Sequence, residues 1–206
     1  MAHYFDKNPT TPSDPNALEA RFHGIDFFFS SDSDVFSKKQ IDFGTKLLLD
    51  TAILDLHTRC IKKGRLLDLG CGYGVIGITM KRVFPAMDVV MADINERAIA
   101  LAQENAKSNH SPFVSIISSD GWANLEGSFD VVMTNPPVRA GKQTVFAFYD
   151  GAFEHLCPGG FLYVVLRKKQ GAPSSLTHLE ELFGNCEILE KDSGYWIMRS
   201  QKGKQT

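Results

Sequence analysis

Apolar residues follow two alternating patterns along most of the chain. Short continuous apolar runs, typical of strands buried on both faces, alternate with stretches in which apolar residues recur at helical spacing. The predicted strands cover residues 65–69, 88–92, 113–117, 129–134, 161–166, 187–190 and 195–200. The predicted helices cover residues 42–56, 75–84, 95–108, 145–156 and 176–183, and we expect Pro158-Gly159-Gly160 to close the fourth.

The alternation of strands and helices predicts the fold class. Strands that are joined by helices lie parallel in one sheet, which the helices cover on both faces. The last two predicted strands lack a helix between them, so we expect one antiparallel strand near the sheet edge. The prediction is an α/β fold with a doubly wound, mostly parallel, seven-stranded sheet.

The region before the first predicted helix has a different pattern. Residues 1–16 are rich in Pro, Thr, Asn and Asp, which predicts irregular structure. Two apolar stretches, residues 18–22 and 25–29, flank His23-Gly24, as expected for a β-hairpin. We therefore expect an N-terminal extension with a hairpin over residues 1–35 and the main domain over residues 36–206.

Composition narrows the class of protein. The 206 residues carry a formal net charge of -2, which argues against coating nucleic acid by bulk charge. The four cysteines form no C-x-x-C pair, so we expect a reducing compartment and no metal. Without a signal peptide or an apolar run long enough to span a bilayer, the expected location is the cytoplasm, with no membrane partner.

A glycine-rich turn follows the first strand of the main domain. In Asp68-Leu69-Gly70-Cys71-Gly72-Tyr73-Gly74, the glycines permit a tight turn and close approach of a ligand to the backbone. The helix that follows directs its N–H groups at such a ligand. The third glycine is displaced by one position from the dinucleotide fingerprint G-x-G-x-x-G, and an ordinary strand-to-helix turn is the alternative.

Acidic residues follow the next two strands. Asp93, about 20 residues after the glycine turn, is placed to accept hydrogen bonds from ribose hydroxyls, or to cap the following helix. Ile94 beside it could pack on an adenine ring. Asp120 could accept from an adenine amine, with Trp122 as a wall, or belong to a simple Asp-Gly turn.

The fourth strand ends in Asn135-Pro136-Pro137. Two prolines prevent continuation as a strand or helix and stiffen the loop. The Asn135 side-chain oxygen and the Pro136 carbonyl could hold the two hydrogens of a planar NH₂ group. That arrangement aims the nitrogen lone pair at an acceptor carbon, which predicts chemistry on an amide-type or exocyclic nitrogen.

These residues resemble the amino-methylating branch of the class I S-adenosylmethionine-dependent methyltransferases. The stretches Val35-Phe36-Ser37, Ile41-Asp42-Phe43-Gly44-Thr45, Asn135-Pro136-Pro137-Val138-Arg139-Ala140-Gly141-Lys142 and Arg167-Lys168-Lys169-Gln170-Gly171-Ala172-Pro173 are similar to its small-domain group. That group includes bacterial 16S ribosomal RNA guanine-N2 methyltransferases. The resemblance implies a Rossmann-like, short, single-domain member that transfers a methyl group to guanine in ribosomal RNA, alone or in the small ribosomal subunit.

The resemblance also implies roles for individual residues. S-adenosylmethionine would be bound by residues at the start of the first predicted helix and after the first four predicted strands of the main domain. These residues are Gly44, Thr45, Asp68, Gly70, Cys71, Gly72, Asp93, Ile94, Asp120, Gly121 and Asn135. The catalytic residues would be Asn135, Pro136 and Pro137. RNA contacts would come from an aromatic residue, the loop after the prolines and several basic residues, namely Phe36, Val138, Arg139, Lys142, Arg167, Lys168 and Lys169. For the basic residues, the alternative is that they form an ordinary solvated surface.

One position departs from the group. Many members carry an aromatic residue after the two prolines, which stacks on the flipped base, whereas this chain has Val138. Such stacking contributes about 1–3 kcal/mol per base. We expect Phe36, Phe146 or Tyr149 to take its place if the target is a nucleobase.

Two other functions remain open. The same loop suits a protein glutamine or a DNA adenine, because both present a planar NH₂. The chain could also be a binding-only protein, either a dinucleotide binder or a methyltransferase-like domain without turnover. The displaced third glycine argues against the former, and the intact Asn135 argues against the latter.

Overall fold

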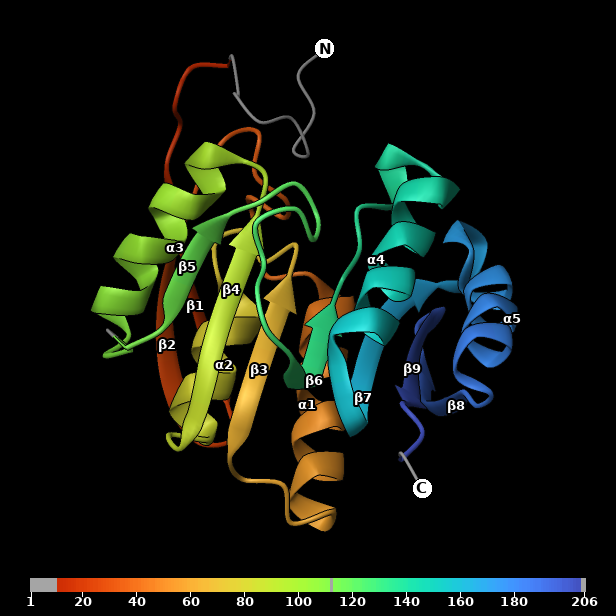
Figure 1. The fold of residues 1–206 in the computed structure, drawn as a ribbon. Helices are drawn as coiled ribbons and strands as arrows, with labels where there is room; N and C mark the ends of the chain where they lie inside the picture. Colours follow the sequence, from red (N-terminus) through yellow and green to blue (C-terminus); the bar gives the residue numbers. More distant parts are fainter. Residues whose placement is uncertain (1–10, 112, 205–206) are drawn as a thin grey trace.

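The computed structural model describes residues 11–111 and 113–204 and contains a seven-stranded sheet covered by helices on both faces (Figure 1). In spatial order, the strands are β5 (Ser115–Ser118), β4 (Met87–Asp93), β3 (Gly64–Leu69), β6 (Phe129–Thr134), β7 (Leu156–Arg167), β9 (Tyr195–Gln201) and β8 (Glu187–Asp192). The helices are α1 (Phe43–Thr58), α2 (Val75–Val83), α3 (Glu96–Ser108), α4 (Lys142–His155) and α5 (Ala172–Phe183), with short 3₁₀ turns η1 (Val138–Ala140) and η2 (Lys168–Gln170).

The direction of the strands follows the prediction. Strands β5, β4, β3, β6 and β7 pair in parallel, and β9 is antiparallel to both β7 and β8. The chain winds from β3 to β4 and β5 toward one edge, and from β6 to β7 toward the other. The winding direction therefore reverses between β3 and β6, where open α/β sheets bind their ligands.

Two apolar cores lie on opposite faces of the sheet. Side chains of α1, α2 and α3, such as Leu48, Ile78 and Ala102, pack in one core together with the N-terminal hairpin. Side chains of α4 and α5, such as Tyr149 and Leu179, pack in the other. Because both faces are covered, the central strands are apolar throughout, which explains the continuous apolar runs in the sequence.

The N-terminal hairpin is present as predicted, with β1 (Asn16–Phe22) paired to β2 (Ile25–Ser31) through a turn in which His23 and Gly24 both have positive φ. Its buried residues belong to the same core as α2 and α3. The division of the chain at residue 35 stays a prediction.

Two asparagines fasten the outer edge of β2 to α3. The Asn109 amide bonds both the N–H and the carbonyl of Phe28, and the Asn105 amide does the same for Ser30, at 2.7–2.9 Å. Asn105 and Asn109 are four residues apart, about one helical turn, and their partners Ser30 and Phe28 are two residues apart in β2. The spacing along the helix therefore matches the spacing along the strand. The side-chain amides take the place of a neighbouring strand and cover an edge that would otherwise expose unpaired groups.

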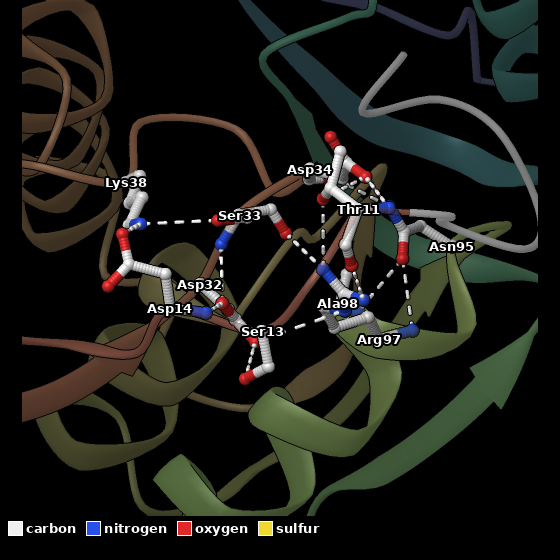
Figure 2. Close-up of polar contacts among 10 residues, drawn as sticks. All are labelled: Thr11, Ser13, Asp14, Asp32, Ser33, Asp34, Lys38, Asn95, Arg97 and Ala98. Atoms are coloured by element: carbon white, nitrogen blue, oxygen red, sulfur yellow. Dashed lines mark hydrogen bonds and ion pairs between the residues drawn. The ribbon is translucent and has the colours of Figure 1, made fainter. Parts of the chain in front are cut away.

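A polar network joins the segment after the hairpin to the start of α3 (Figure 2). The Arg97 guanidinium donates to the carbonyls of Thr11 (2.8 Å) and Ser33 (2.9 Å), and Asn95 donates to the carbonyl of Asp34 (2.8 Å). Burial raises the pKa of Asp32, but hydrogen bonds and the Arg97 charge outweigh it and leave that pKa lowered. The network fixes residues 33 and 34, directly before Val35.

Several boundaries differ from the predicted ones. The expectation that Pro158-Gly159-Gly160 closes a helix is wrong, because α4 ends at His155 and β7 begins at Leu156. The strand register shifts between Phe129 and Val131, so the proline and glycines occupy an irregular part of β7, where a missing N–H is tolerated. Helix α5 starts at Ala172 because Gly171, with φ of 108°, permits the turn before it. No helix in the described ranges is long and apolar enough to cross a membrane.

Candidate functional site

The glycine turn and the Asn-Pro-Pro loop lie side by side where the sheet reverses its winding. They follow β3 and β6, which are neighbours in the sheet. The buried Thr134 hydroxyl, at the end of β6, donates to the carbonyl of Leu69, at the end of β3, over 2.8 Å. This bond fixes the two loops relative to each other.

The backbone of the glycine turn follows a path that favours glycine. Gly70, Gly72 and Gly74 have φ values of 73°, 55° and 94°. The N–H groups of Gly70 and Cys71 bond the carbonyl of Ala92, at the end of β4, at 2.8 and 2.9 Å. Helix α2 begins directly after the turn, so the turn presents backbone and a helix N-terminus rather than side chains.

A cavity of about 270 Å³ opens above this turn. Most of the residues predicted to bind the cofactor line it: Thr45, Gly70, Cys71, Gly72, Asp93, Ile94, Asp120, Gly121 and Asn135. Two predicted residues are not among its lining residues, namely Asp68 and Gly44. The cavity therefore joins residues from several loops that are distant in sequence.

Asp93 lines the cavity, and both of its carboxylate oxygens accept hydrogen bonds. One accepts from the Gly72 N–H at 2.8 Å and the other from the Asn95 N–H at 2.9 Å. Burial raises its pKa, although these bonds act in the opposite direction. The alternative that Asp93 caps α3 is wrong, because the Asn95 side chain caps that helix. The Ile94 N–H also bonds this carboxylate, which leaves acceptor capacity for a ligand hydroxyl.

Asp68 lies beneath the turn and is fully buried. One oxygen accepts from the Gly77 N–H in α2 at 2.8 Å, whereas Oδ1 has no hydrogen-bond partner among the described residues. Burial is the main reason that its pKa is raised to about 7. A buried acceptor without a donor is costly, so Oδ1 is suited to a donor supplied by a ligand or a water molecule.

Phe148, rather than Trp122, is the aromatic residue that lines the cavity beside Gly121. A Cβ on Gly70 or Gly121 would lie 3.4 or 3.8 Å from the Phe148 ring, so this ring stands between the two loops. Trp122 instead stacks on His155 and donates to the Phe148 carbonyl at 3.2 Å, outside the cavity lining. The expectation for Trp122 is therefore wrong. Asp120 is exposed at the rim, with its carbonyl in a turn with Ala123.

Asn135 lines this cavity and also a second one beside it. Its Nδ2 lies 3.0 Å from Thr45 Oγ1 and 3.4 Å from Asp42 Oδ2. Within residues 11–111 and 113–204 no group donates to Asn135 Oδ1. The amide nitrogen is therefore engaged with α1, and the amide oxygen is the end left for a ligand.

The two prolines form a tight turn after Asn135. The Val138 N–H donates to the Pro136 carbonyl at 2.9 Å, and Pro137 has φ of -75° and ψ of 79°, the geometry of an inverse γ-turn. One lone pair of the Pro136 carbonyl is thus used within the loop, and the second is available.

The second cavity has a volume of about 330 Å³. Its wall combines the loop after the prolines with aromatic and basic side chains: Phe36, Pro136, Val138, Arg139, Arg167, Gln170 and Tyr195. It shares residues 35–37, Asp42 and Asn135 with the first cavity. The site therefore has two adjoining compartments with Asn135 at their boundary.

Among the three aromatic residues that could replace the one missing at Val138, only Phe36 lines these cavities. Phe146 stacks on His178, with ring centroids 4.0 Å apart. Tyr149 is fully buried and bonds Ser175. Phe36 is 39% exposed at the boundary of the compartments, where a base could reach it.

The predicted basic residues fall into two groups. Arg139 and Arg167 line the second cavity, and the Arg167 guanidinium lies 4.6 Å from the centre of the Tyr195 ring. Lys142, Lys168 and Lys169 are exposed outside the lining, with Lys142 over the Phe146 ring. The two arginines are therefore the basic groups nearest to a ligand of the second cavity.

Several residues that line the two cavities are not among the site residues predicted from the sequence, and Asp42, Phe148 and Tyr195 are examples. Asp42 lies in a stretch that resembles the small-domain group, and in the structure its side chain also caps α1. Phe148 and Tyr195 belong to apolar patterns that fit core positions equally well. Their role depends on which loops they reach, and the sequence contains no signal for that.

The donor and acceptor groups of the first cavity fit a nucleoside with a charged amino-acid tail. Asp93 can accept from two ribose hydroxyls, and Ile94 offers an apolar surface to a flat ring. A Cβ on Gly72 would meet no protein atom within 4 Å, so the turn leaves open space over its backbone. Within the described residues, no group of three or more His, Cys, Asp or Glu side chains is arranged to hold a metal ion.

This sheet, with its glycine turn and adjoining compartments, defines the Rossmann-like class of S-adenosylmethionine-dependent methyltransferases. The chain belongs to the methyltransferase small domain family, whose model matches residues 26–199. The resemblance seen in the sequence is thereby confirmed, and S-adenosylmethionine is the cofactor.

Two relatives of known sequence are similar to this chain, and one of them is named as a methyltransferase. The chain is 41% identical over 202 residues to the uncharacterized protein YbxB of Bacillus subtilis, covering 97% of this chain and 98% of that protein. It is 36% identical over 167 residues to ribosomal RNA small subunit methyltransferase C of Pasteurella multocida, covering 79% of this chain and 48% of the relative. The chain thus spans about half the length of the methyltransferase C sequences that it matches.

A solved structure resembles the fold across most of the chain. The T. thermophilus 16S rRNA N2 methyltransferase RsmC, in complex with AdoMet and guanosine, superposes with a TM-score of 0.82 and 27% identity. The match covers 94% of this chain and 52% of that protein.

Proposed function

We propose that this protein transfers a methyl group from S-adenosylmethionine to the exocyclic N2 amine of a guanine in 16S ribosomal RNA. The observation that carries the proposal is the position of Asn135 at the boundary of two compartments, with its amide nitrogen held by α1 and its oxygen left for a ligand. That oxygen is an acceptor for one hydrogen of a planar amine.

The first compartment would hold the cofactor. Asp93 would accept from the ribose hydroxyls, Ile94 and Phe148 would enclose the adenine, and Asp120 would accept from its amine. Gly70 and Gly72 would let the methionine end of the cofactor approach the backbone. Asp68, which lies beneath the turn, would accept a hydrogen bond through its unpartnered oxygen. When bound, S-adenosylmethionine supplies a methyl group activated by a sulfonium.

The second compartment would hold the guanine. Asn135 Oδ1 and the free lone pair of the Pro136 carbonyl would accept the two amine hydrogens, which turns the nitrogen lone pair toward the first compartment. Positive charge that develops on the nitrogen is stabilised by the same two acceptors. Phe36 would stack on the base in place of the aromatic residue that Val138 replaces.

Several features support RNA as the substrate. Arg139 and Arg167 line the compartment, and the neighbouring Lys142, Lys168 and Lys169 are exposed, as expected of side chains that bind phosphates. The T. thermophilus relative is a 16S rRNA methyltransferase, and its structure contains guanosine. A ribosomal substrate would also locate the protein in the cytoplasm.

Methyl transfer from labelled S-adenosylmethionine tests the proposal directly. We expect label in 16S RNA, free or in small subunits from cells that lack the gene, and nucleoside mapping should identify N2-methylguanosine. Label in a protein glutamine or in DNA adenine instead would replace the proposed substrate. Absence of transfer to all of these, with cofactor binding intact, would point to a binding-only domain.

A second measurement tests the basic residues. Replacing Arg139 and Arg167 by alanine should weaken RNA binding and reduce the slope of log affinity against log salt by about 1 for each phosphate that is no longer neutralised. Lys46→Ala, on the exposed side of α1 and outside both cavities, is the matched control. An unchanged salt slope in the arginine variants would remove them from the RNA-binding surface.

A further inference from the structure

Asn135 is oriented by two residues at the start of α1. Its Nδ2 faces the Thr45 hydroxyl and the Asp42 carboxylate. A hydroxyl can donate or accept, but a carboxylate only accepts. Asp42 therefore requires the NH₂ end of the amide on its side, and the oxygen on the other side. Without Asp42, the two ends of the amide, which are almost the same size, could exchange places.

Asp42 is itself held by two donors. Its Oδ1 accepts from the Tyr195 hydroxyl at 2.9 Å, and its Oδ2 accepts from the Thr45 N–H at 3.2 Å. Burial raises the pKa of Tyr195, while a hydrogen bond with Arg167 lowers it; the pKa is raised on balance, so the phenol stays protonated and keeps donating. The carboxylate is thus fixed from both sides.

Gly44 is the residue that lets Tyr195 reach Asp42. A Cβ at Gly44 would lie 2.5 Å from Cε1 of the Tyr195 ring, which is closer than two carbon atoms can approach. The Gly-Thr pair after Asp42 therefore has two separate uses: Gly44 makes room for the ring, and Thr45 provides the acceptor for Asn135.

We propose that Asp42 is a positioning residue for methyl transfer, which together with Thr45 and Tyr195 holds the Asn135 amide with its oxygen toward the target amine. This inference rests on the proposed function, because it assigns Asn135 the acceptor role. An amide turned the other way would present N–H groups to the N–H groups of the substrate, and the acceptor would be lost.

Asp42 also lines the first compartment, so a competing role is direct contact with the ammonium group of the cofactor. The two roles make opposite predictions. A cofactor ligand affects the Kd for S-adenosylmethionine, whereas a positioning residue affects kcat and leaves that Kd unchanged.

Three variants separate these roles. Asp42→Ser keeps a side chain that caps α1, but one too short to reach Asn135 or Tyr195. Thr45→Val keeps the shape of the side chain and removes its hydroxyl. Tyr195→Phe keeps the ring and removes the donor. The control is Thr51→Val, which makes the same change elsewhere on α1, outside both cavities. Thr45→Ser, which retains the hydroxyl, is the conservative variant that tests for rescue.

We expect Asp42→Ser and Thr45→Val to lower kcat by about tenfold to hundredfold, as for misplaced catalytic groups, with the Kd for cofactor unchanged. Tyr195→Phe should have a smaller effect, Thr45→Ser should recover part of the kcat that Thr45→Val loses, and Thr51→Val should retain wild-type kcat. An increase in the Kd for cofactor in Asp42→Ser, with kcat at saturating cofactor unchanged, would overturn the inference in favour of the competing role.

A measurement without any methyl acceptor keeps this test separate from that of the proposed function. The side-chain NH₂ of Asn135, assigned by its loss in Asn135→Ala, should exchange with solvent more slowly in the wild type than in Asp42→Ser or Thr45→Val. Equal exchange rates would overturn the inference even if 16S RNA is methylated. A difference in exchange without methylation of RNA would instead leave the orientation established and refute the proposed substrate.

Discussion

In the proposed function, the two loops at the centre of the site perform adjacent tasks by different means. The turn after β3 presents backbone, shaped by glycines with positive φ and anchored by Asp93, only 21 residues from Gly72. The loop after β6 presents one side chain, Asn135, whose partners Thr45 and Asp42 lie 90 and 93 residues away. The bond from the Thr134 hydroxyl to the Leu69 carbonyl links the ends of the two strands that carry these loops.

This difference indicates how the two tasks can fail. A backbone turn fails when a side chain is added to it or its local anchor is removed, and the consequence is weaker cofactor binding. A side-chain acceptor fails when its distant partners move, and the consequence is slower transfer with cofactor still bound. Cofactor binding and methyl transfer should therefore be separable by mutation.

The largest effect is expected for Asn135→Ala. Loss of the acceptor should lower kcat by about 100-fold or more, the scale measured for removal of one electrostatic contact at a reacting centre. Calorimetry should show cofactor binding retained. Gln103→Ala, which removes an exposed amide from α3, serves as the control. Full activity in the Asn135 variant would mean that the loop after β6 does not provide the acceptor needed for methyl transfer.

The reciprocal change is Gly72→Ala. The added methyl group would enter the open space over the turn, so the affinity for S-adenosylmethionine should fall by about tenfold, or about 1.4 kcal/mol. Gly24→Ala is a matched control, because Gly24 also has positive φ and open space around it but lies in the hairpin turn. Equal cofactor affinity in both variants would contradict the proposed role of the turn.

The pH dependence of stability tests the local anchoring of the turn. The pKa of Asp68 is about 7 in the folded protein and close to 3.8 when unfolded, so the folded state binds more protons between these values. Protonation of Asp68 therefore adds to the free energy of unfolding in acid. This stabilisation is lost as pH rises to about 7, by at most about 1.4 kcal/mol per pH unit.

Asp68→Asn removes this contribution. The free energy of unfolding of the variant, minus that of the wild type, should rise with pH from about 4 to 7 and then become constant. Urea unfolding without cofactor, at several pH values, provides the measurement. If the free energies of unfolding of the wild type and of Asp68→Asn change in parallel with pH, Asp68 is not the group that titrates.

The smallest effect is expected at the rim. Arg97→Ala removes the donor that holds the carbonyls of Thr11 and Ser33, and should reduce the free energy of unfolding by about 1 kcal/mol. Cofactor binding should weaken slightly, because residues 35–37 of the cavity lining follow this anchor. Arg21→Ala, at an exposed ion pair of the hairpin, should change neither quantity.

Much of the fold could be predicted because its signals are local. The glycines and apolar runs of β3, β4 and β6 predict their strands to within two residues, and His23-Gly24 predicts the hairpin turn. The prediction was wrong where a local breaker has a tertiary use: Pro158 ends no helix because the neighbouring strand accommodates it in an irregular part of β7. Trp122 was likewise placed by sequence proximity to Asp120, whereas its ring packs on α4.

The amino-acid sequence by itself determined the class of sheet, the turn that follows β3 and the identity of the residues that end its central strands, because backbone propensity and side-chain chemistry act over a few residues. Only the tertiary structure decided that the nitrogen end of the Asn135 amide faces Thr45 and Asp42, that Phe148 lines the first cavity, and that Gly44 leaves room for the Tyr195 ring. These outcomes depend on distances between groups up to 153 residues apart, which are fixed when the helices dock on the sheet.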